Sequence, residues 1–179
     1  MIEVSKQERL ENRLQPQIKE FREERQTLIL STISSDGFPH VSYSPFARIE
    51  QHYYVLISEI AEHTRNIQAQ PKLSFMLVED ETNCRQVYAR KRLTYKADAN
   101  QVGRDSSEWQ QAIGQLQNRF GEIIDNLSQL SDFKLFRLTP TTGRFVKGFG
   151  QAYTVQGNDD IDFVHLDQGH QKITAENEA

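Results

Sequence analysis

The sequence predicts an α+β fold in which many antiparallel strands form a barrel and a few helices flank it. Short runs of β-branched and aromatic residues alternate with polar ones, and turn residues such as Asp36-Gly37 separate them. Two segments have helical spacing instead, one near the N-terminus and one around Trp109. Many strands with few helices between them favour a barrel over an open sheet.

The first part of the chain predicts one helix and then strands. Apolar residues recur at near-helical spacing in the first segment: Val4, Leu10, Leu14, Ile18 and Phe21. Pro16 lies inside this pattern and should kink or divide the helix. From Gln26 the period becomes two, and Asp36-Gly37 predicts a hairpin between QTLILSTIS and FPHVSYSPFARIE. The runs HYYVLISE and KLSFMLVED are further strands, separated by a short helix at 59–70.

The second part predicts a fifth strand over 85–97, a helical pair and two more strands. An apolar stripe that includes Trp109, with N-cap candidates at 105–107, indicates the first helix, and Gly121 breaks the stripe into two helices. Asp132–Val155 then has the pattern of two strands joined by a turn at Thr139–Gly143. Residues 156–179 form a polar tail of low periodicity.

The last of these strands has one aromatic face and one nearly bare face. Phe145, Phe149 and Tyr153 lie on the first, and Gly148, Gly150 and Ala152 on the second. A bare strip indicates either a close backbone crossing in a small barrel or the approach of a flat ligand. The pattern itself leaves both interpretations open.

Composition excludes several classes of protein. A single cysteine, Cys84, rules out an internal disulfide framework and a multi-cysteine zinc site. No apolar run approaches the roughly 20 residues that cross a bilayer, and no secretory signal is evident. We therefore expect a cytoplasmic protein without membrane insertion. The net charge of -4 argues against a nucleic-acid binder.

Three kinds of side chain are candidates for chemistry. Arg90 and Arg92 share one face of the fifth predicted strand, where they suit phosphate or carboxylate groups or form a solvated edge. None of the five histidines has a partner at zinc-helix spacing. His170, in the tail, is either a ligand delivered into a cleft or a solvated residue. Asp132 must be exposed, cap a backbone group or pair with a cation, and either it or Asp167 could hold a ligating histidine.

Several segments also carry a family resemblance. SEIAEHTRNIQAQPKLSFMLVED is similar to the strand–helix–strand segment of split-barrel proteins related to the flavin-dependent pyridoxamine phosphate oxidases. ARKRLTYKADA and FKLFRLTPTTGRFVKGFGQAYTV resemble the haem-utilisation branch, the HutZ/HugZ type. The resemblance implies a homodimeric, split antiparallel β-barrel with flanking helices, like the FMN-binding split barrels. Residues 1–155 would form the barrel domain with its N-terminal helix, and 156–179 a C-terminal loop that carries the haem ligand.

The resemblance also implies a site for b-type haem, as substrate and cofactor, between two protomers. His170 would be the axial ligand of the haem iron, and Asp132 would orient that histidine across the dimer. Arg92 would face the haem as a second catalytic group. Three residues of the GRFVKGFG block are expected near the haem: Lys147, Phe149 and Gly150. His63 fits the interface helix.

The implied reaction is oxidative degradation of haem with dioxygen and external electrons, which releases iron for iron utilisation. An electron donor is then a required partner, and a haem-delivery protein is a further candidate. The alternatives are a non-enzymatic haem carrier or storage protein and an FMN-dependent oxidoreductase of the same fold. Arg48 stands where a ligand for the flavin phosphate is sought, but no lysine accompanies it, which argues against FMN.

Overall fold

A computed structural model describes residues 5–157 and 161–162 of the protein. Its helices are α1 (Lys6–Glu23), α2 (Glu62–Ala69), α3 (Ser107–Phe120) and α4 (Ile123–Gln129), with 3₁₀ turns η1 (Glu81–Asn83) and η2 (Val87–Ala89). Its strands are β1 (Thr27–Ile33), β2 (Pro39–Pro45), β3 (Ala47–Ile49), β4 (His52–Ser58), β5 (Lys72–Val78), β6 (Arg92–Val102), β7 (Phe133–Gly148), β8 (Gln151–Gln156) and β9 (Ile161–Asp162).

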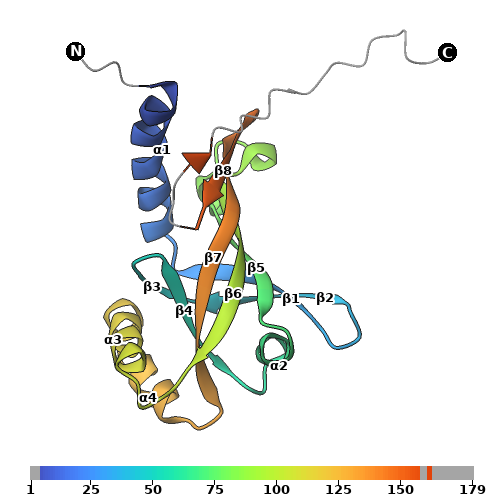
Figure 1. Cartoon of the computed structure of the whole chain (residues 1–179), viewed down its shortest axis with the longest axis vertical. Helices are drawn as coiled ribbons and strands as arrows, with labels where there is room; N and C mark the ends of the chain where they lie inside the picture. Colours follow the sequence, from blue (N-terminus) through green and yellow to red (C-terminus); the bar gives the residue numbers. More distant parts are fainter. Residues whose placement is uncertain (1–4, 158–160, 163–179) are drawn as a thin grey trace, which may run out of the picture.

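The nine strands of the described residues form one antiparallel sheet in the order β2-β1-β5-β6-β7-β4-β3, and β8 and β9 extend from β7 (Figure 1). The sheet curls so that β2 also contacts β4, although no ladder joins these two strands. The α+β class and the antiparallel sheet are confirmed. None of the described helices has the length and apolar character needed to cross a bilayer.

The N-terminal elements follow the predicted pattern closely. Ser34 N–H donates to the Phe38 carbonyl at 2.9 Å, and Gly37 has a φ of 86°, which closes the predicted hairpin between β1 and β2. Helix α1 continues through Pro16, so this proline does not divide it. Leu14 and Ile18, on either side of the proline, are completely buried and hold the helix against the sheet.

The predicted turn at Thr139–Gly143 is wrong, because β7 runs through it as a single strand. The register against β6 shifts here: Tyr95 pairs with Gly143, but Ala97 pairs with Pro140. The extra residue on β7 makes a bulge, which bends a strand without ending it. A Cβ on Gly143 would lie 2.3 Å from the Thr94 carbonyl oxygen, so only glycine fits this crossing. The real turn is at Phe149-Gly150, between β7 and β8.

The bulge also reverses which positions of β7 face the core. Before it, Phe136 and Leu138 are buried, and after it Phe145 is buried. The residues that face the barrel core therefore have even numbers before the bulge and odd numbers after it, as expected when one residue is inserted. The aromatic face predicted for the last strand is the barrel core, since Tyr153 is buried as well. Phe149 is the exception, because it lies in the turn and is 60% exposed.

Two apolar layers stabilise the fold. Inside the barrel, the ring centre of Tyr53 lies 4.7 Å from that of Phe75 with the rings tilted, and the ring centre of Phe75 lies 5.6 Å from that of Tyr95. On the opposite side of β4 and β7, helices α3 and α4 bury a second cluster around Trp109 and Leu116. Gly121 ends α3 with a φ of 75°, which confirms the predicted break between the two helices.

The predicted fifth strand is too long at its N-terminal end. Residues 85–91 contain η2 and irregular chain, and β6 begins only at Arg92. The side chain of Gln86 accepts a hydrogen bond from Tyr88 N–H, and this local bond favours a turn over an extended ladder. Glu79 N–H donates to the Lys91 carbonyl at 2.8 Å. Residues 80–90 therefore form a loop between β5 and β6, called the β5–β6 loop below, whose two ends are joined by this hydrogen bond.

Candidate functional site

The outer face of β1 and β5 carries a groove of about 720 Å³, called groove A below. Its floor is apolar and consists of the half-buried side chains of Ile29, Met76 and Val78. One wall is formed by residues 79–83, which include η1, and the other by residues 24–27, where α1 passes into β1. This volume lies within the range of small-molecule sites in proteins.

Arg92 lies on the same face of the sheet as groove A. It pairs with Val78 on β5 and with Val146 on β7, and paired residues of antiparallel strands project to the same side. Its guanidinium donates to the Arg90 carbonyl at 3.3 Å, and no carboxylate pairs with it among the described residues. Arg92 therefore offers a cation without a counter-ion beside an apolar floor.

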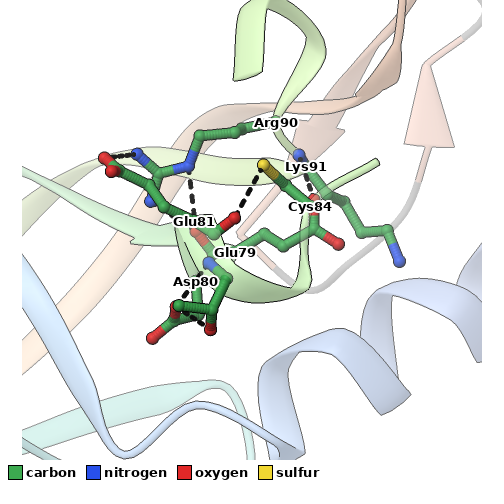
Figure 2. A network of polar contacts seen from close by, with 7 residues as sticks. Glu79, Asp80, Glu81, Cys84, Arg90 and Lys91 are labelled. Atoms are coloured by element: carbon green, nitrogen blue, oxygen red, sulfur yellow. Dashed lines mark hydrogen bonds and ion pairs between the residues drawn. The ribbon is translucent and has the colours of Figure 1, made fainter. Parts of the chain in front are cut away.

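The three cations of the Arg90–Arg92 run have separate roles. Arg90 Nε donates to the Glu79 carbonyl at 3.0 Å, and its Nη1 to Glu81 Oε1 at 2.9 Å (Figure 2). Lys91 Nζ lies 5.6 Å from the ring centre of Phe21 on α1. The predicted shared face of two arginines on one strand is wrong, because only Arg92 belongs to β6.

A second groove, groove B, has a volume of about 340 Å³ and lies among the ends of β2 and β4, the start of α2, and α3 and α4. Its lining is mainly apolar: Tyr43, Ser44, Pro45, Leu56, Ile57, Ser58, Ala61, His63, Leu116, Ile124, Leu127 and Phe133. Tyr43 is 69% exposed and Val41, on the same face of β2, is 67% exposed. Groove B thus opens beside an uncovered apolar surface of the β1–β2 hairpin.

Asp132 lies beside groove B, immediately before β7. Its Oδ2 accepts a hydrogen bond of 2.6 Å from Ser58 Oγ, and its carbonyl accepts one of 2.8 Å from Glu59 N–H. Ser58 itself lines the groove. The half-buried carboxylate is held by a hydroxyl rather than by a cation, so it keeps acceptor capacity for another donor.

His63 also lines groove B, and its Nδ1 lies 2.8 Å from Ser42 Oγ. Burial lowers the pKa of His63 from its ordinary value, and the neighbouring charge of His40 lowers it further. His40 is itself 3.3 Å from the Glu62 carboxylate. The lowered pKa favours the neutral form of His63, which can accept a hydrogen bond or a metal.

The lowered pKa of His63 predicts that the fold loses stability in mild acid. Below about pH 6.5 the unfolded chain takes up a proton that the folded chain binds less readily, so stability falls as the pH falls. We expect His63→Asn, which cannot titrate, to reduce this slope in thermal melts between about pH 7.5 and 5.5. The lowered pKa of His52 leaves some dependence in the variant. An identical slope in both proteins would contradict the assignment.

The predicted site residues fall into two groups at opposite ends of β7 (Figure 1). Arg92 lies at one end with Lys147 and the Phe149-Gly150 turn, where Gly150 has a φ of 64°. Asp132 lies at the other end, roughly 40 Å away along the strand at the usual rise per residue. His165, Asp167 and His170 lie outside the described residues. The residues that the structure does describe contain no group of three or more His, Cys, Asp or Glu side chains suited to a metal ion.

Some polar contacts near these grooves were not predicted from the sequence. Ser58 and Ser42, which bond Asp132 and His63, stand at unremarkable positions in strands, and only pairing across the fold reveals them. A further network joins Tyr54 Oη to Glu108 at 2.8 Å and Arg137 to the same carboxylate at 2.9 Å. Burial and the Glu108 carboxylate raise the pKa of Tyr54 to about 12. This network fixes the start of α3 to the sheet.

The sequence pattern of the pyridoxamine 5'-phosphate oxidase family matches residues 14–147. The chain belongs to this family. The heme oxygenase HutZ of Vibrio cholerae is 59% identical over 174 residues, which cover 97% of this chain and 99% of HutZ. Within the pyridoxamine 5'-phosphate oxidase family, the chain is therefore of the HutZ type.

Two solved structures agree with this assignment. The crystal structure of Vibrio cholerae HutZ, described as a heme storage protein, has a TM-score of 0.72 and 58% identity, and covers 76% of this chain and 96% of its own. Campylobacter jejuni ChuZ has a TM-score of 0.82 and 31% identity, and covers 91% of this chain and 67% of its own. The split-barrel fold of the pyridoxamine 5'-phosphate oxidase family is thus confirmed. Arg48 does not line either groove, and its guanidinium lies 5.9 Å from the Tyr53 ring.

Proposed function

We propose that this protein binds haem and degrades it oxidatively, with dioxygen and external electrons, and that it releases the iron for use by the cell. The observation that carries the proposal is groove A, whose apolar floor ends at Val78, the residue that pairs with Arg92 across β5 and β6. Similarity along nearly the whole chain to the heme oxygenase HutZ supports it.

The floor of groove A and the cations near it fit the chemistry of b-type haem, while its walls also carry four carboxylates: Glu24, Glu79, Asp80 and Glu81. A flat apolar macrocycle suits the floor formed by Ile29, Met76 and Val78, and carboxylate side groups suit a guanidinium such as Arg92. Arg25, which also lines the groove, has a buried Nε that lacks a hydrogen-bond partner in the described residues. An anionic group in the groove would satisfy such a donor.

The separation of the two groups of residues favours a homodimer with haem at the interface. Within one chain Arg92 and Asp132 lie at opposite ends of β7, so one ligand cannot contact both. In a two-fold dimer, groove A of one protomer meets groove B of its partner, and two equivalent sites result. The exposed apolar side chains of Val41 and Tyr43 beside groove B are suited to burial in such an interface.

His170 would supply the axial nitrogen for the iron, and Asp132 would accept a hydrogen bond from the other ring nitrogen of that histidine. A carboxylate in this position fixes the imidazole tautomer and raises its basicity. Arg92 would orient a carboxylate side group of haem by charge-assisted hydrogen bonds. Lys147, Phe149 and Gly150 would border the same end of groove A. When bound, haem itself supplies the redox chemistry.

The reaction needs an electron donor as partner. A protein that delivers haem is a second candidate partner. We propose a cytoplasmic location, where both substrates and reductant are supplied. A haem carrier or storage protein is the second candidate function, because the HutZ crystal structure is described as that of a heme storage protein. Neither groove shows the paired arginine and lysine expected for a flavin phosphate, so FMN is not the proposed cofactor.

One absorption experiment separates these functions. Ferric haem added to the purified protein should produce a Soret band, and ascorbate in air should then bleach it while a ferrous chelator detects free iron. A Soret band that persists under these conditions would favour the carrier or storage function. Protein that is yellow as isolated and does not bind haem would favour the FMN-dependent oxidoreductase.

A further inference from the structure

We infer that Arg90, which itself lines groove A, is a positioning residue: it holds the wall of the groove in place, and its donors are engaged by the wall rather than by the ligand. The inference rests on the proposed function for its consequence in haem binding, but the contacts of Arg90 stand independently. The wall consists of residues 79–83, and it has no strand neighbour beyond Glu79. Something other than the sheet must therefore keep it in position.

Arg90 provides this link through three contacts with two residues of the wall. Its Nε and Nη2 both donate to the Glu79 carbonyl, and its Nη1 donates to Glu81 Oε1 at 2.9 Å (Figure 2). The contacts span the point where β5 ends and η1 begins. A planar guanidinium can bridge a carbonyl and a carboxylate in this way, whereas an ammonium group is a single point of charge.

The other contacts of the wall are local to it. Asp80 Oδ1 accepts hydrogen bonds from Thr82 N at 2.9 Å and from Thr82 Oγ1 at 2.6 Å. These bonds lower the pKa of Asp80 and shape η1, but they do not attach η1 to the rest of the protein. Lys91 N–H donates to Glu79 Oε2 at 3.1 Å, and this bond joins only the two ends of the β5–β6 loop. Arg90 is the side chain that connects η1 to the ends of this loop, through Glu81 and the Glu79 carbonyl.

This arrangement separates Arg90 from Arg92 in function. The Nε, Nη1 and Nη2 groups of Arg90 all donate to Glu79 or Glu81, which makes Arg90 a poor partner for an added anion. Its guanidinium instead pairs with the Glu81 carboxylate, one of the acidic side chains of the wall. Loss of Arg90 should open the groove, while loss of Arg92 should remove a contact with the ligand.

Cys84 provides a direct readout of the wall. It is the single cysteine of the chain, it is half-buried, and its Sγ lies 3.1 Å from the Glu81 carbonyl at the end of η1. We expect Arg90→Lys and Arg90→Gln both to raise the rate of Cys84 labelling by a chromogenic disulfide reagent by about 10-fold in haem-free protein. Amide hydrogen exchange at residues 82–84 should accelerate in parallel. The control variant Arg85→Gln changes an exposed arginine of the same β5–β6 loop. Its Cys84 should be labelled at the wild-type rate.

The haem arm of the experiment tests the consequence. Both Arg90 variants should require about 10-fold more haem for half-saturation, with the Soret maximum of the bound fraction unchanged. Wild-type labelling in Arg90→Lys would overturn the inference, because charge alone would then suffice. An unchanged half-saturation or a displaced Soret maximum would also overturn it. If wild-type protein binds no haem, the proposed function fails, while the labelling rates still decide whether Arg90 holds the wall.

Discussion

His170→Ala is expected to abolish the native haem spectrum and to lower haem affinity by at least about 100-fold, since even the loss of an outer partner of a metal ligand costs 10–100-fold. The three histidines of the described residues already have partners at a ring nitrogen: His40 with Glu62 at 3.3 Å, His52 with Thr139 at 3.1 Å, and His63 with Ser42 at 2.8 Å. His170 is the ligand that the family resemblance implies. A titration of ferric haem followed at the Soret band measures the effect.

His165→Ala and His63→Ala are the matched controls for this prediction. The first removes the other histidine of the same tail, and the second removes the histidine that lines groove B. Both should retain the wild-type Soret maximum, and all three variants should elute as the wild-type protein does on size exclusion. A native spectrum in His170→Ala would transfer the ligand role to His165. Loss of the spectrum in His63→Ala alone would transfer it to groove B.

Local patterns were sufficient to predict most of the fold. The hairpin at Asp36-Gly37, the helix α1 and the break between α3 and α4 each depend on residues close together in the sequence. Turn chemistry and helical spacing act at this range, so the sequence expresses them directly. The resemblance then supplied the split barrel, which periodicity could not distinguish from other barrels.

The errors have non-local causes. A run such as Thr139–Gly143 has the composition of a turn, but β6 lies alongside it and supplies hydrogen bonds that keep β7 extended. Thr141 Oγ1 donates to the Lys96 carbonyl at 3.2 Å at this bulge. The bare strip of Gly148 and Ala152 is a related case, because it lies opposite the core and a Cβ on Gly148 would have no atom within 4 Å. The strip is therefore not a close backbone crossing, which occurs instead at Gly143 on the core side.

The candidate site was only partly accessible from the sequence for the same reason. Arg92 could be singled out by its neighbours in the chain, but the sequence does not show that Arg90 pairs with Glu81 while no carboxylate of the described residues pairs with Arg92. The floor of groove A was missed, although Ile29 alternates with the buried Leu28 and Leu30 in a way that indicates an outward apolar face. Outward-facing apolar residues on a strand indicate a binding surface when a neighbouring strand contributes further ones, as Met76 on β5 does beside Ile29.

A mixed dimer of Arg92→Ala and Asp132→Ala chains should recover about half of the wild-type rate of haem degradation, although each variant alone falls by about 10-fold or more. If groove A of one chain meets Asp132 of its partner, this dimer carries one site with both defects and one site with neither. The two chains, co-expressed with different affinity tags, can be purified as the mixed dimer. The rate is then measured as bleaching of the Soret band by ascorbate in air.

The reciprocal dimer makes the test decisive. A wild-type chain paired with an Arg92→Ala/Asp132→Ala chain has one defect in each shared site, so its rate should stay near that of the single variants. If one chain formed a whole site, the two results would be exchanged: the first dimer would be slow and the second would recover half. The positions of Arg92 and Asp132 at opposite ends of β7 lead us to expect the first pattern, in which each site is shared between two protomers. A protein that remains monomeric with haem bound would contradict the shared site altogether.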